Sequence, residues 1–265
     1  MNKESRLQEA YLSRLEKQRR KIMAARILLA LAFFLLWETA ADRGWIDSFF
    51  FSSPSRLGRL FLSMWRDGSL FLHVGITLTE TLVSFALVVV IGLAVSLLLW
   101  LSDSVFQVLE PYLVILNSLP KSALAPLLIV WLGANSRTII VAGMSVAIFG
   151  TILNLYTGFT ETSREKIRLI YTLHGTKKDA LTKVVLPSTV PMIISIMKVN
   201  IGLCLVGVVI GEFIGARDGL GYLIIYGSQV FRLDWVMMSI VLLCMIAMLL
   251  YGLLGLIEKR CLRRR

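Results

Sequence analysis

The sequence has few cysteines, few histidines and no nucleotide-binding loop. Its 265 residues include three cysteines, Cys204 and Cys244 within apolar runs and Cys261 in a basic tail, so we expect no disulfide framework. The two histidines, His73 and His174, fall on opposite sides of the predicted topology, and no metal site is predicted. The sequence contains neither G-x-x-x-x-G-K-[ST] nor G-x-S-x-G, and we predict no catalytic residues.

Charged residues are also scarce, and most of them are basic. Only 17% of the residues are charged, 57% are hydrophobic and the mean hydropathy is +0.76, which excludes an ordinary soluble domain and indicates an integral membrane protein. The formal net charge is +11. Because the basic residues avoid the apolar runs and gather between them, we attribute this charge to membrane topology and not to nucleic-acid binding.

Apolar windows of about twenty residues predict an all-α, polytopic fold with six transmembrane helices. The expected spans are residues 22–41, 79–101, 107–132, 138–158, 190–213 and 235–257. Lys and Arg number 8 from the N-terminus to Arg26, near the start of the first span, 6 between the fourth and fifth spans and 5 in the tail. The segments on the opposite side of the membrane contain 7. By the positive-inside rule, both termini and the loop between the fourth and fifth spans are cytoplasmic.

This topology divides the chain into three parts. Residues 1–21 form a basic amphipathic leader, which we expect to lie on the anionic inner leaflet. Residues 22–257 form the transmembrane domain, with a cytoplasmic loop at 159–189, and residues 258–265 form a basic cytoplasmic tail. The first apolar run resembles the core of a cleaved signal, but its long basic lead and the charge balance favour a retained anchor. Pro54 is placed to begin a short external helix.

The cytoplasmic loop carries two apolar stripes at helical spacing. One stripe lies within residues 165–174 and the other within 180–185, with Gly175 between them. Thr176 is placed as the N-cap of the second helix, and Asp179 completes a capping box. The pattern predicts two short helices that meet at a glycine corner and form a compact arm suited to a groove on another protein. Packing of the stripes against the bundle is the alternative.

Polar residues inside the predicted spans are candidates for a transport pathway, because they are costly in a bilayer. Lys121 lies between Pro120 and Pro126, where a kinked helix exposes carbonyl groups to a cavity. Asn200 lies in the fifth span, and Glu212 near the outer end of that span is a candidate gate or packing anchor.

Four residues are predicted to shape turns: Pro120, Pro187, Gly219 and Gly221. Pro187 marks the place where the cytoplasmic loop turns back into the membrane. The two glycines are expected to make a tight turn before a short helix that ends by Asp234.

Four stretches together resemble one family. "GTKKDALTKVVLP", "LPKSALAPLLIVWLG", "VLPSTVPMIIS" and "VGVVIGEFIGARDGLGYLI" are similar, over roughly residues 70–260, to type I ABC importer permeases of the nitrate/sulfonate/taurine branch. The chain departs from that branch at two positions. His174 stands where the family usually has a glycine, with Gly175 one place later, and Glu80 stands where an arginine is common.

The resemblance implies the type I ABC importer fold and a permease subunit that works by alternating access in a bacterial inner membrane. The implied partners are a second permease copy, two cytoplasmic ATPase subunits that bind ATP and Mg²⁺, and an extracytoplasmic substrate-binding protein, while this chain binds no cofactor. The implied solutes are sulfonates, taurine, nitrate, or vitamin and pyrimidine precursors. The residues expected to contact the ATPase surround the loop corner: Tyr171, Thr172, Leu173, His174, Gly175, Thr176, Lys177 and Lys178.

Two other classes of protein share some of these features. A self-contained carrier or channel also has membrane spans without a nucleotide site, but the sequence shows no inverted repeat and the capped loop would have no role. A non-transporting scaffold would keep the loop and have no need of Lys121. For the lysines at the loop corner, lipid headgroups are the alternative partner.

Overall fold

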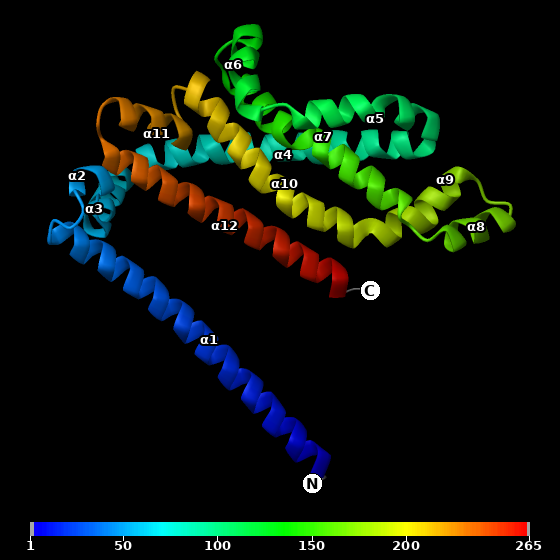
Figure 1. Cartoon of the computed structure of the whole chain (residues 1–265), viewed down its shortest axis with the longest axis horizontal. Coiled ribbons are helices and arrows are strands. Elements are labelled where there is room, and N and C mark those ends of the chain that lie inside the picture. The colour runs from blue at the N-terminus through cyan, green and yellow to red at the C-terminus, as the bar shows by residue number, and fades with distance from the viewer. Residues whose placement is uncertain (1–2, 264–265) are drawn as a thin grey trace. The chain divides into compact units, whose positions relative to one another are not determined.

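The computed structural model describes the backbone of residues 3–263 and the side chains of residues 17–18 and 20–260 (Figure 1). The regular structure of this described part is helical throughout, as predicted. The elements are α1 (Lys3–Asp42), α2 (Ser48–Phe51), α3 (Pro54–Arg66), α4 (Ser69–Leu101), α5 (Asp103–Ser118), α6 (Lys121–Leu132), α7 (Ser136–Thr160), α8 (Arg164–Thr172), α9 (Lys177–Ala180), the π-helical η1 (Leu181–Val185), α10 (Leu186–Gly215), α11 (Leu220–Gln229) and α12 (Leu233–Arg263).

The chain divides into two compact units, and the first comprises residues 1–63. In this unit α1 joins the predicted leader and the first span in one helix, whose segment Arg20–Asp42 is long and apolar enough to cross a membrane. Pro54 begins α3, as expected. The Glu38 carboxylate accepts a hydrogen bond from the Ser55 N–H at 3.0 Å, which satisfies a backbone donor that the first turn of α3 leaves free.

The second unit, residues 64–265, contains the remaining spans. Over the whole described chain, five helices are long and apolar enough to cross a membrane, and α5 with α6 makes a sixth if the bent pair is one span. The predicted third span, 107–132, is not a straight helix, because α5 and α6 meet at 95°. Pro120 has no backbone N–H and holds Leu119 extended (ψ 140°), so the helix cannot continue through this point.

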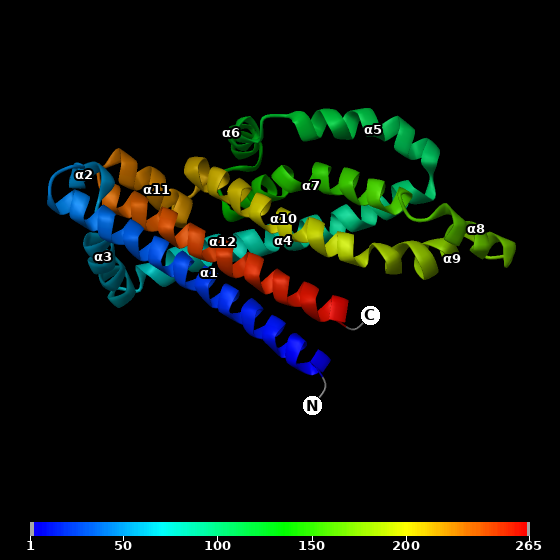
Figure 2. The same ribbon diagram turned by 60° about the horizontal axis from the view of Figure 1, so that its bottom comes forward.

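At the centre of the second unit, α7 packs against α4 and α10 (Figure 2). Glycines permit the closest approach. A Cβ atom added to Gly207 on α10 would lie 2.8 Å from Gly143 Cα on α7, and one added to Gly143 would lie 2.6 Å from Ser84 Oγ on α4. Contacts between small residues are the usual way in which helices pack within a bilayer. Around them lies a buried apolar cluster: Val88, Leu99, Ala147, Ile148, Ile152 and Cys204.

The segment η1 joins α9 to α10, so that Lys177–Gly215 is one continuous helix. The predicted turn at Pro187 is therefore wrong. Pro187 cannot donate a hydrogen bond to the Lys183 carbonyl, and its ring would clash with that group in an α-helix. In η1 the Leu186 N–H bonds instead to the Leu181 carbonyl, five residues back, and this wider turn accommodates the proline without ending the helix.

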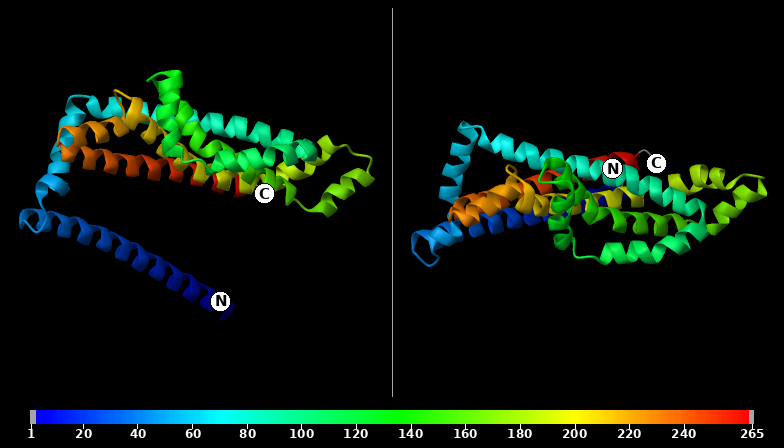
Figure 3. Two further views of the ribbon diagram at one scale, coloured as in Figure 1. Left: turned by 45° about the horizontal axis from the view of Figure 1, so that its top comes forward. Right: turned by 90° about the horizontal axis from the view of Figure 1, so that it is seen from above.

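The two ends of the bundle carry different structures. α8 and α9 project at one end, near the start of α10, whereas α11 lies at the other end, beside the start of α4 (Figure 1; Figure 3). α10 has 30 residues and runs between these ends over roughly 45 Å, which exceeds the thickness of the hydrocarbon core. The basic residues of the loop predict that the α8 end is cytoplasmic, which places α11 at the external end.

Replacing Gly207 with alanine should destabilise the bundle, because the new methyl group would overlap Gly143 and the Ala142 carbonyl. We expect the free energy of unfolding in detergent to fall by roughly 1–3 kcal/mol. Gly202→Ala on the same helix is the matched control, since nothing lies within 4 Å of a Cβ atom there and alanine favours the helix. Equal stability of the two variants would contradict the close contact between α7 and α10.

Candidate functional site

The second arm of the predicted cytoplasmic loop begins with the expected capping box. Thr176 Oγ1 accepts a hydrogen bond from the Asp179 N–H at 3.2 Å, and Asp179 Oδ2 accepts one from the Thr176 N–H at 2.9 Å. Asp179 also pairs with Lys183 at 2.9 Å. The hydrogen bond from Lys183, followed by those from Thr176, holds the pKa of the Asp179 carboxyl well below its usual range. The start of α9 is therefore firmly defined.

The corner between α8 and α9 differs from the predicted glycine corner. His174, and not Gly175, takes the left-handed conformation, with φ 59°. The His174 N–H bonds to the Tyr171 carbonyl at 3.0 Å and the Gly175 N–H to the Ile170 carbonyl at 2.9 Å, which is the Schellman pattern for ending a helix. Gly175 is required for space, because a Cβ atom there would lie 2.5 Å from the Ile170 side chain. A histidine thus holds a backbone conformation that favours glycine.

The two arms of the loop place their apolar residues differently. The second arm joins a buried cluster with the neighbouring ends of α4, α7 and α10: Ala180, Leu181 and Val185 with Trp100, Leu155, Phe159 and Met197. On the first arm, Ile167 and Ile170 pack against this cluster. Leu169, Tyr171 and Leu173 point away from it and are 59%, 46% and 70% exposed. We call these three residues the exposed tip, an apolar surface on a loop that the charge pattern places in water.

The other predicted corner residues divide between the bundle and the surface. Lys177 Nζ lies 5.4 Å from the centre of the Trp100 ring and 3.8 Å from Asp103 Oδ1, so this side chain fastens the arm to the bundle. Lys178 is exposed. Thr172 Oγ1 donates a hydrogen bond to a carbonyl of its own helix at 2.8 Å. Only Lys178, of the two lysines, is fully presented at the surface.

At the other end of α10, Glu212 links three helices. It is 1% exposed, and its Oε1 accepts a hydrogen bond from Thr77 Oγ1 on α4 at 2.7 Å. Its Oε2 accepts the Gly221 N–H at the start of α11 at 2.6 Å, and Thr77 Oγ1 accepts the neighbouring Leu220 N–H at 2.8 Å. These bonds satisfy N–H groups that the first turn of α11 cannot satisfy itself. Glu212 therefore holds α11 against α4 and α10.

The glycines of this region make room for the Glu212 carboxylate. Gly219, a predicted turn residue, is the N-cap of α11 with φ 109°, and its N–H donates to His73 Nδ1 at 3.0 Å. Gly221 lies inside the first turn of α11 and not in the turn before it. Added Cβ atoms at Gly219 and Gly221 would lie 2.5 Å and 2.7 Å from Glu212 carboxylate oxygens. Side chains at these two positions would break the link.

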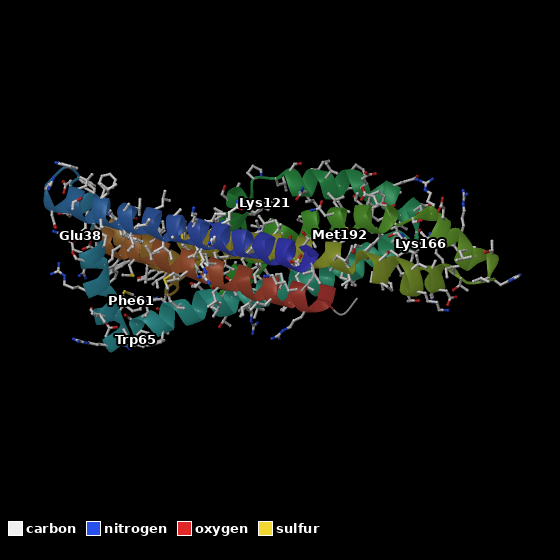
Figure 4. All side chains as sticks on the ribbon, turned by 90° about the horizontal axis from the view of Figure 1, so that it is seen from below. Glu38, Phe61, Trp65, Lys121, Lys166 and Met192 are labelled. Atoms are coloured by element: carbon white, nitrogen blue, oxygen red, sulfur yellow. The ribbon has the colours of Figure 1, made fainter. Side chains whose placement is uncertain are left out.

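Lys121 lies at the break between α5 and α6, directly after Pro120. Its Nζ donates hydrogen bonds to the Asn117 carbonyl at 2.7 Å and the Leu116 carbonyl at 3.2 Å, so it caps the end of α5. The same ammonium group lies 5.9 Å from the centre of the Phe149 ring on α7. Figure 4 shows Lys121 alongside the bundle, well away from Lys166 on the α8 arm.

A cavity of about 190 Å³ with mixed polar and apolar walls lies between α5, α7 and α10. Asn117, Asn154 and Asn200, one from each helix, line it together with Thr151 and Ser195. Asn200 is 3% exposed, and its Nδ2 has no hydrogen-bond partner among the described residues. We call this the amide cavity. A buried amide donor without a partner is unfavourable in apolar surroundings and favours binding of a polar molecule.

Sequence reasoning identified Asn200 and Glu212 but not the residues that meet them. His73 and Thr77 were missed, although polar side chains at helical spacing on an apolar span are a usable signal. Asn117 and Asn154 appear in the sequence only as single amides within apolar runs. Their convergence on Asn200 depends on how α5, α7 and α10 pack, which the sequence pattern does not contain.

A bundle of membrane-spanning helices with a cavity between its spans and an exposed apolar tip at one end has the architecture expected of a transport subunit. The chain matches the family model described as the binding-protein-dependent transport system inner membrane component over residues 88–265. The chain belongs to this family. It is thus a multi-pass protein of the inner membrane. The matched residues include the broken span, the amide cavity, the loop and Glu212, whereas His73 and Thr77 on α4 precede them.

The relatives of the chain are permease proteins. It is 28% identical to a probable ABC transporter permease protein of Haemophilus influenzae over 225 residues, 85% of this chain and 91% of the relative. It is 28% identical to the formylaminopyrimidine transport permease protein ThiX of Halalkalibacterium halodurans over 195 residues, 74% of this chain and 77% of ThiX. It is 26% identical to the taurine transport system permease protein TauC of Escherichia coli over 236 residues, 87% and 84% of the two chains.

Solved ABC transporters share the fold. The inward-facing MetNI methionine transporter matches with a TM-score of 0.61 at 22% identity, over 71% of this chain and 94% of the matched chain. An amino acid ABC transporter matches with a TM-score of 0.59 at 20% identity, over 76% and 98%. The family and the fold confirm the prediction of a non-catalytic permease subunit of an ABC importer, and they do not support a carrier or channel that works without ATP.

His174→Gly should stabilise the corner, because glycine adopts the left-handed conformation without the steric cost of a side chain, about 1 kcal/mol. We expect amide hydrogen exchange in α8 to slow by about fivefold. Gly175→Ala should have the opposite effect, since its Cβ atom would overlap Ile170. Faster exchange in His174→Gly than in the unchanged protein would rule out the Schellman corner.

Proposed function

We propose that two copies of this chain form the pathway of an ABC importer, and that the exposed tip joins each copy to a cytoplasmic ATPase subunit. The ATPase subunits bind ATP and Mg²⁺, an extracytoplasmic binding protein delivers the solute, and this chain binds no cofactor. Transport proceeds by alternating access. The observation that carries the coupling role is the exposure of Leu169, Tyr171 and Leu173 on a short, capped arm.

The exposed tip has the chemistry of a docking surface. Lys166, Arg168 and Lys178 are exposed beside its apolar side chains, so an apolar centre has a basic rim. Such a surface fits a groove with apolar walls and an acidic edge. Packing against the bundle does not explain the tip, because Ile167 and Ile170 already occupy that contact. Lipid headgroups account for the basic rim but not for the apolar centre.

The second arm is built to pass movement of the tip to the membrane helices. Ala180 and Val185 are fully buried, and α9, η1 and α10 form one continuous helix. A displacement of the corner therefore moves α10 as a rigid element. This helix carries Asn200 at the amide cavity and Glu212 at the external end. One helix therefore connects the proposed ATPase contact, the cavity and the contacts of Glu212 with α4 and α11.

Leu173→Asp should prevent capture of the ATPase subunit, because it places a charge at the centre of the apolar tip. We expect the amount of ATPase that co-purifies with the permease to fall at least about tenfold, the effect of about 1.4 kcal/mol of lost affinity. Phe231→Asp is the matched control: Phe231 is 68% exposed and Leu173 is 70% exposed, but Phe231 lies in the turn between α11 and α12.

Two results would contradict this coupling role. One is normal ATPase capture by a folded Leu173→Asp protein. The other is full transport by the purified chain in liposomes without any ATPase, which would revive the carrier interpretation.

The amide cavity is the proposed centre of the pathway. Asn117 and Asn154 are exposed on the surface of the bundle, and an asparagine that faces lipid is unfavourable. These side chains therefore face a polar path or the second copy, and Asn200 extends the path into the bundle. Lys121 places a positive group beside Asn117, at the edge of the cavity, and Glu212 on α10 holds α4 and α11 at the external end.

Asn200→Leu should lower transport by roughly tenfold, because the solute loses a hydrogen-bonding group inside the membrane. Assembly with the ATPase and thermal stability should be unchanged or improved, since leucine removes an unpartnered amide. The measurement is uptake into proteoliposomes that contain the whole transporter. Ile201→Leu, a volume-conserving change at the adjacent buried position, is the control. Unchanged uptake by Asn200→Leu would place the pathway elsewhere.

The proposed domain boundaries follow this assignment. Residues 22–257 form the membrane domain, with the coupling loop at 159–189, while the leader at 1–21 and the tail at 258–265 lie on the cytoplasmic side. Relatives named for taurine, aliphatic sulfonates, nitrate, riboflavin and formylaminopyrimidine share 24% to 28% identity with the chain. These names include both anions and heterocycles, so overall similarity does not determine the solute class.

A further inference from the structure

The first turn of α11 is held by side chains that come from other helices. The first N–H groups of any helix have no partner within it, and the N-cap residue Gly219 has no side chain that could accept one. Three acceptors on α4 and α10 take this role. The bonds are Gly219 N–H to His73 Nδ1 at 3.0 Å, Leu220 N–H to Thr77 Oγ1 at 2.8 Å and Gly221 N–H to Glu212 Oε2 at 2.6 Å. One of the three acceptors is therefore an imidazole, a group that titrates near neutral pH.

The bond to His73 exists in only one protonation state of the ring. A ring nitrogen that accepts an N–H carries no proton, so His73 is neutral and its proton lies on Nε2. A proton added at Nδ1 would point at the Gly219 N–H, and two donors cannot bond to each other. The Thr77 hydroxyl does not titrate, and a protonated carboxyl group at Glu212 would still have an acceptor oxygen. Of the three acceptors, His73 alone loses its bond on protonation.

The surroundings of His73 offer a protonated ring other partners. Among the described residues, the charged groups that act on it are the carboxylates of Asp67, before α4, and Asp218, after α10. Glu212 on α10 faces the same turn of α11, and Tyr222 on α11 stacks on the imidazole with 6.4 Å between the ring centres. His73 is only 9% exposed, so a positive charge is unfavourable where the ring now lies. A protonated ring is therefore more favourable beside the two aspartates and water than against α11.

We propose that His73 is a proton-binding site at the external end of the bundle: the neutral ring docks the first turn of α11 on α4, and a proton from outside releases it. The charge pattern places this end in the external medium. Because the neutral ring makes the bond, its contribution to docking is complete above the ordinary pKa of histidine, about 6.5, and is lost progressively as the pH falls below that value. The inference goes beyond the proposed function, since the docking of α11 does not depend on which solute the chain transports.

The test is amide hydrogen exchange of the full chain in nanodiscs, one pH unit above and one pH unit below the ordinary pKa of histidine, with each rate corrected for the intrinsic effect of pH. The signal is the protection factor of peptides that cover residues 219–223. At the lower pH, a released imidazole is about ten times more often protonated than neutral, so opening of the first turn is favoured about tenfold. We expect its protection factor to fall about tenfold between the two pH values, and protection in α7 to stay constant.

His73→Asn should remove the pH response, because its side-chain oxygen can accept the Gly219 N–H and does not titrate. We expect equal protection at both pH values. His73→Phe keeps a ring but has no acceptor, so protection should be low at both. His174→Asn is the matched control: it removes the other histidine of the chain, which lies at the predicted cytoplasmic end in a left-handed conformation that asparagine also adopts. Its pH response in α11 should equal that of the unchanged protein.

Equal protection of the first turn at both pH values in the unchanged protein would overturn the inference, as would an undiminished pH response in His73→Asn. If neither His73 variant folds, NMR of labelled histidine ring nitrogens in the unchanged protein decides the question. The signals that persist in His174→Asn should show an unprotonated Nδ1 at the higher pH, and a protonated Nδ1 there would also overturn the inference. None of these results changes capture of the ATPase by the exposed tip. Loss of that capture would contradict the coupling function and leave the pH response as it is.

Discussion

The structure depends on one constraint: a bilayer supplies no water, so every backbone N–H and C=O group within it needs a partner from the protein. Three departures from regular α-helix show how the chain supplies these partners locally. Lys121 caps the carbonyls at the break in the third span. The wider turn of η1 accommodates Pro187. Side chains of α4 and α10 accept the first N–H groups of α11. The amide cavity, the α8–α9 arm and the contacts of Glu212 all adjoin these irregular points.

The constraint also explains why α10 connects the two ends of the bundle. Its contact with α7 runs through Gly207 and Gly143, which have no side chains, so the two backbones lie in direct contact. The arm at one end of α10 is buried through Ala180 and Val185, and Glu212 fixes the other end. In the proposed coupling, a force applied at the exposed tip would be carried by packing and not by a flexible linker.

Hydropathy and charge were enough to place the spans along the chain, because the bilayer imposes length and polarity on each of them, but they did not show that the third consists of two helices at 95°. The capping box at Thr176 was also predictable, since it depends on residues three apart. The conformation of the corner was not predictable. Glycine usually takes the left-handed position at the end of a helix, and nothing in the sequence indicates that His174 is held there by the Schellman hydrogen bonds. Pro187 was misjudged because a proline can be absorbed by a π turn as well as end a helix. The partners of Glu212 required the tertiary fold, as they come from α4 and α11.

The π turn at Leu181–Val185 also sets the direction, around the axis of α10, in which the α8–α9 arm points. Successive residues of an α-helix are rotated by about 100° around its axis, so the number of residues between the corner and the amide cavity fixes the direction in which the arm points. Deletion or insertion of one residue in this stretch would leave the helix intact and its hydropathy nearly unchanged. It would nevertheless rotate the arm around the helix axis by about 100°. The length of the helix therefore determines the orientation of the arm, independently of which side chains the arm exposes.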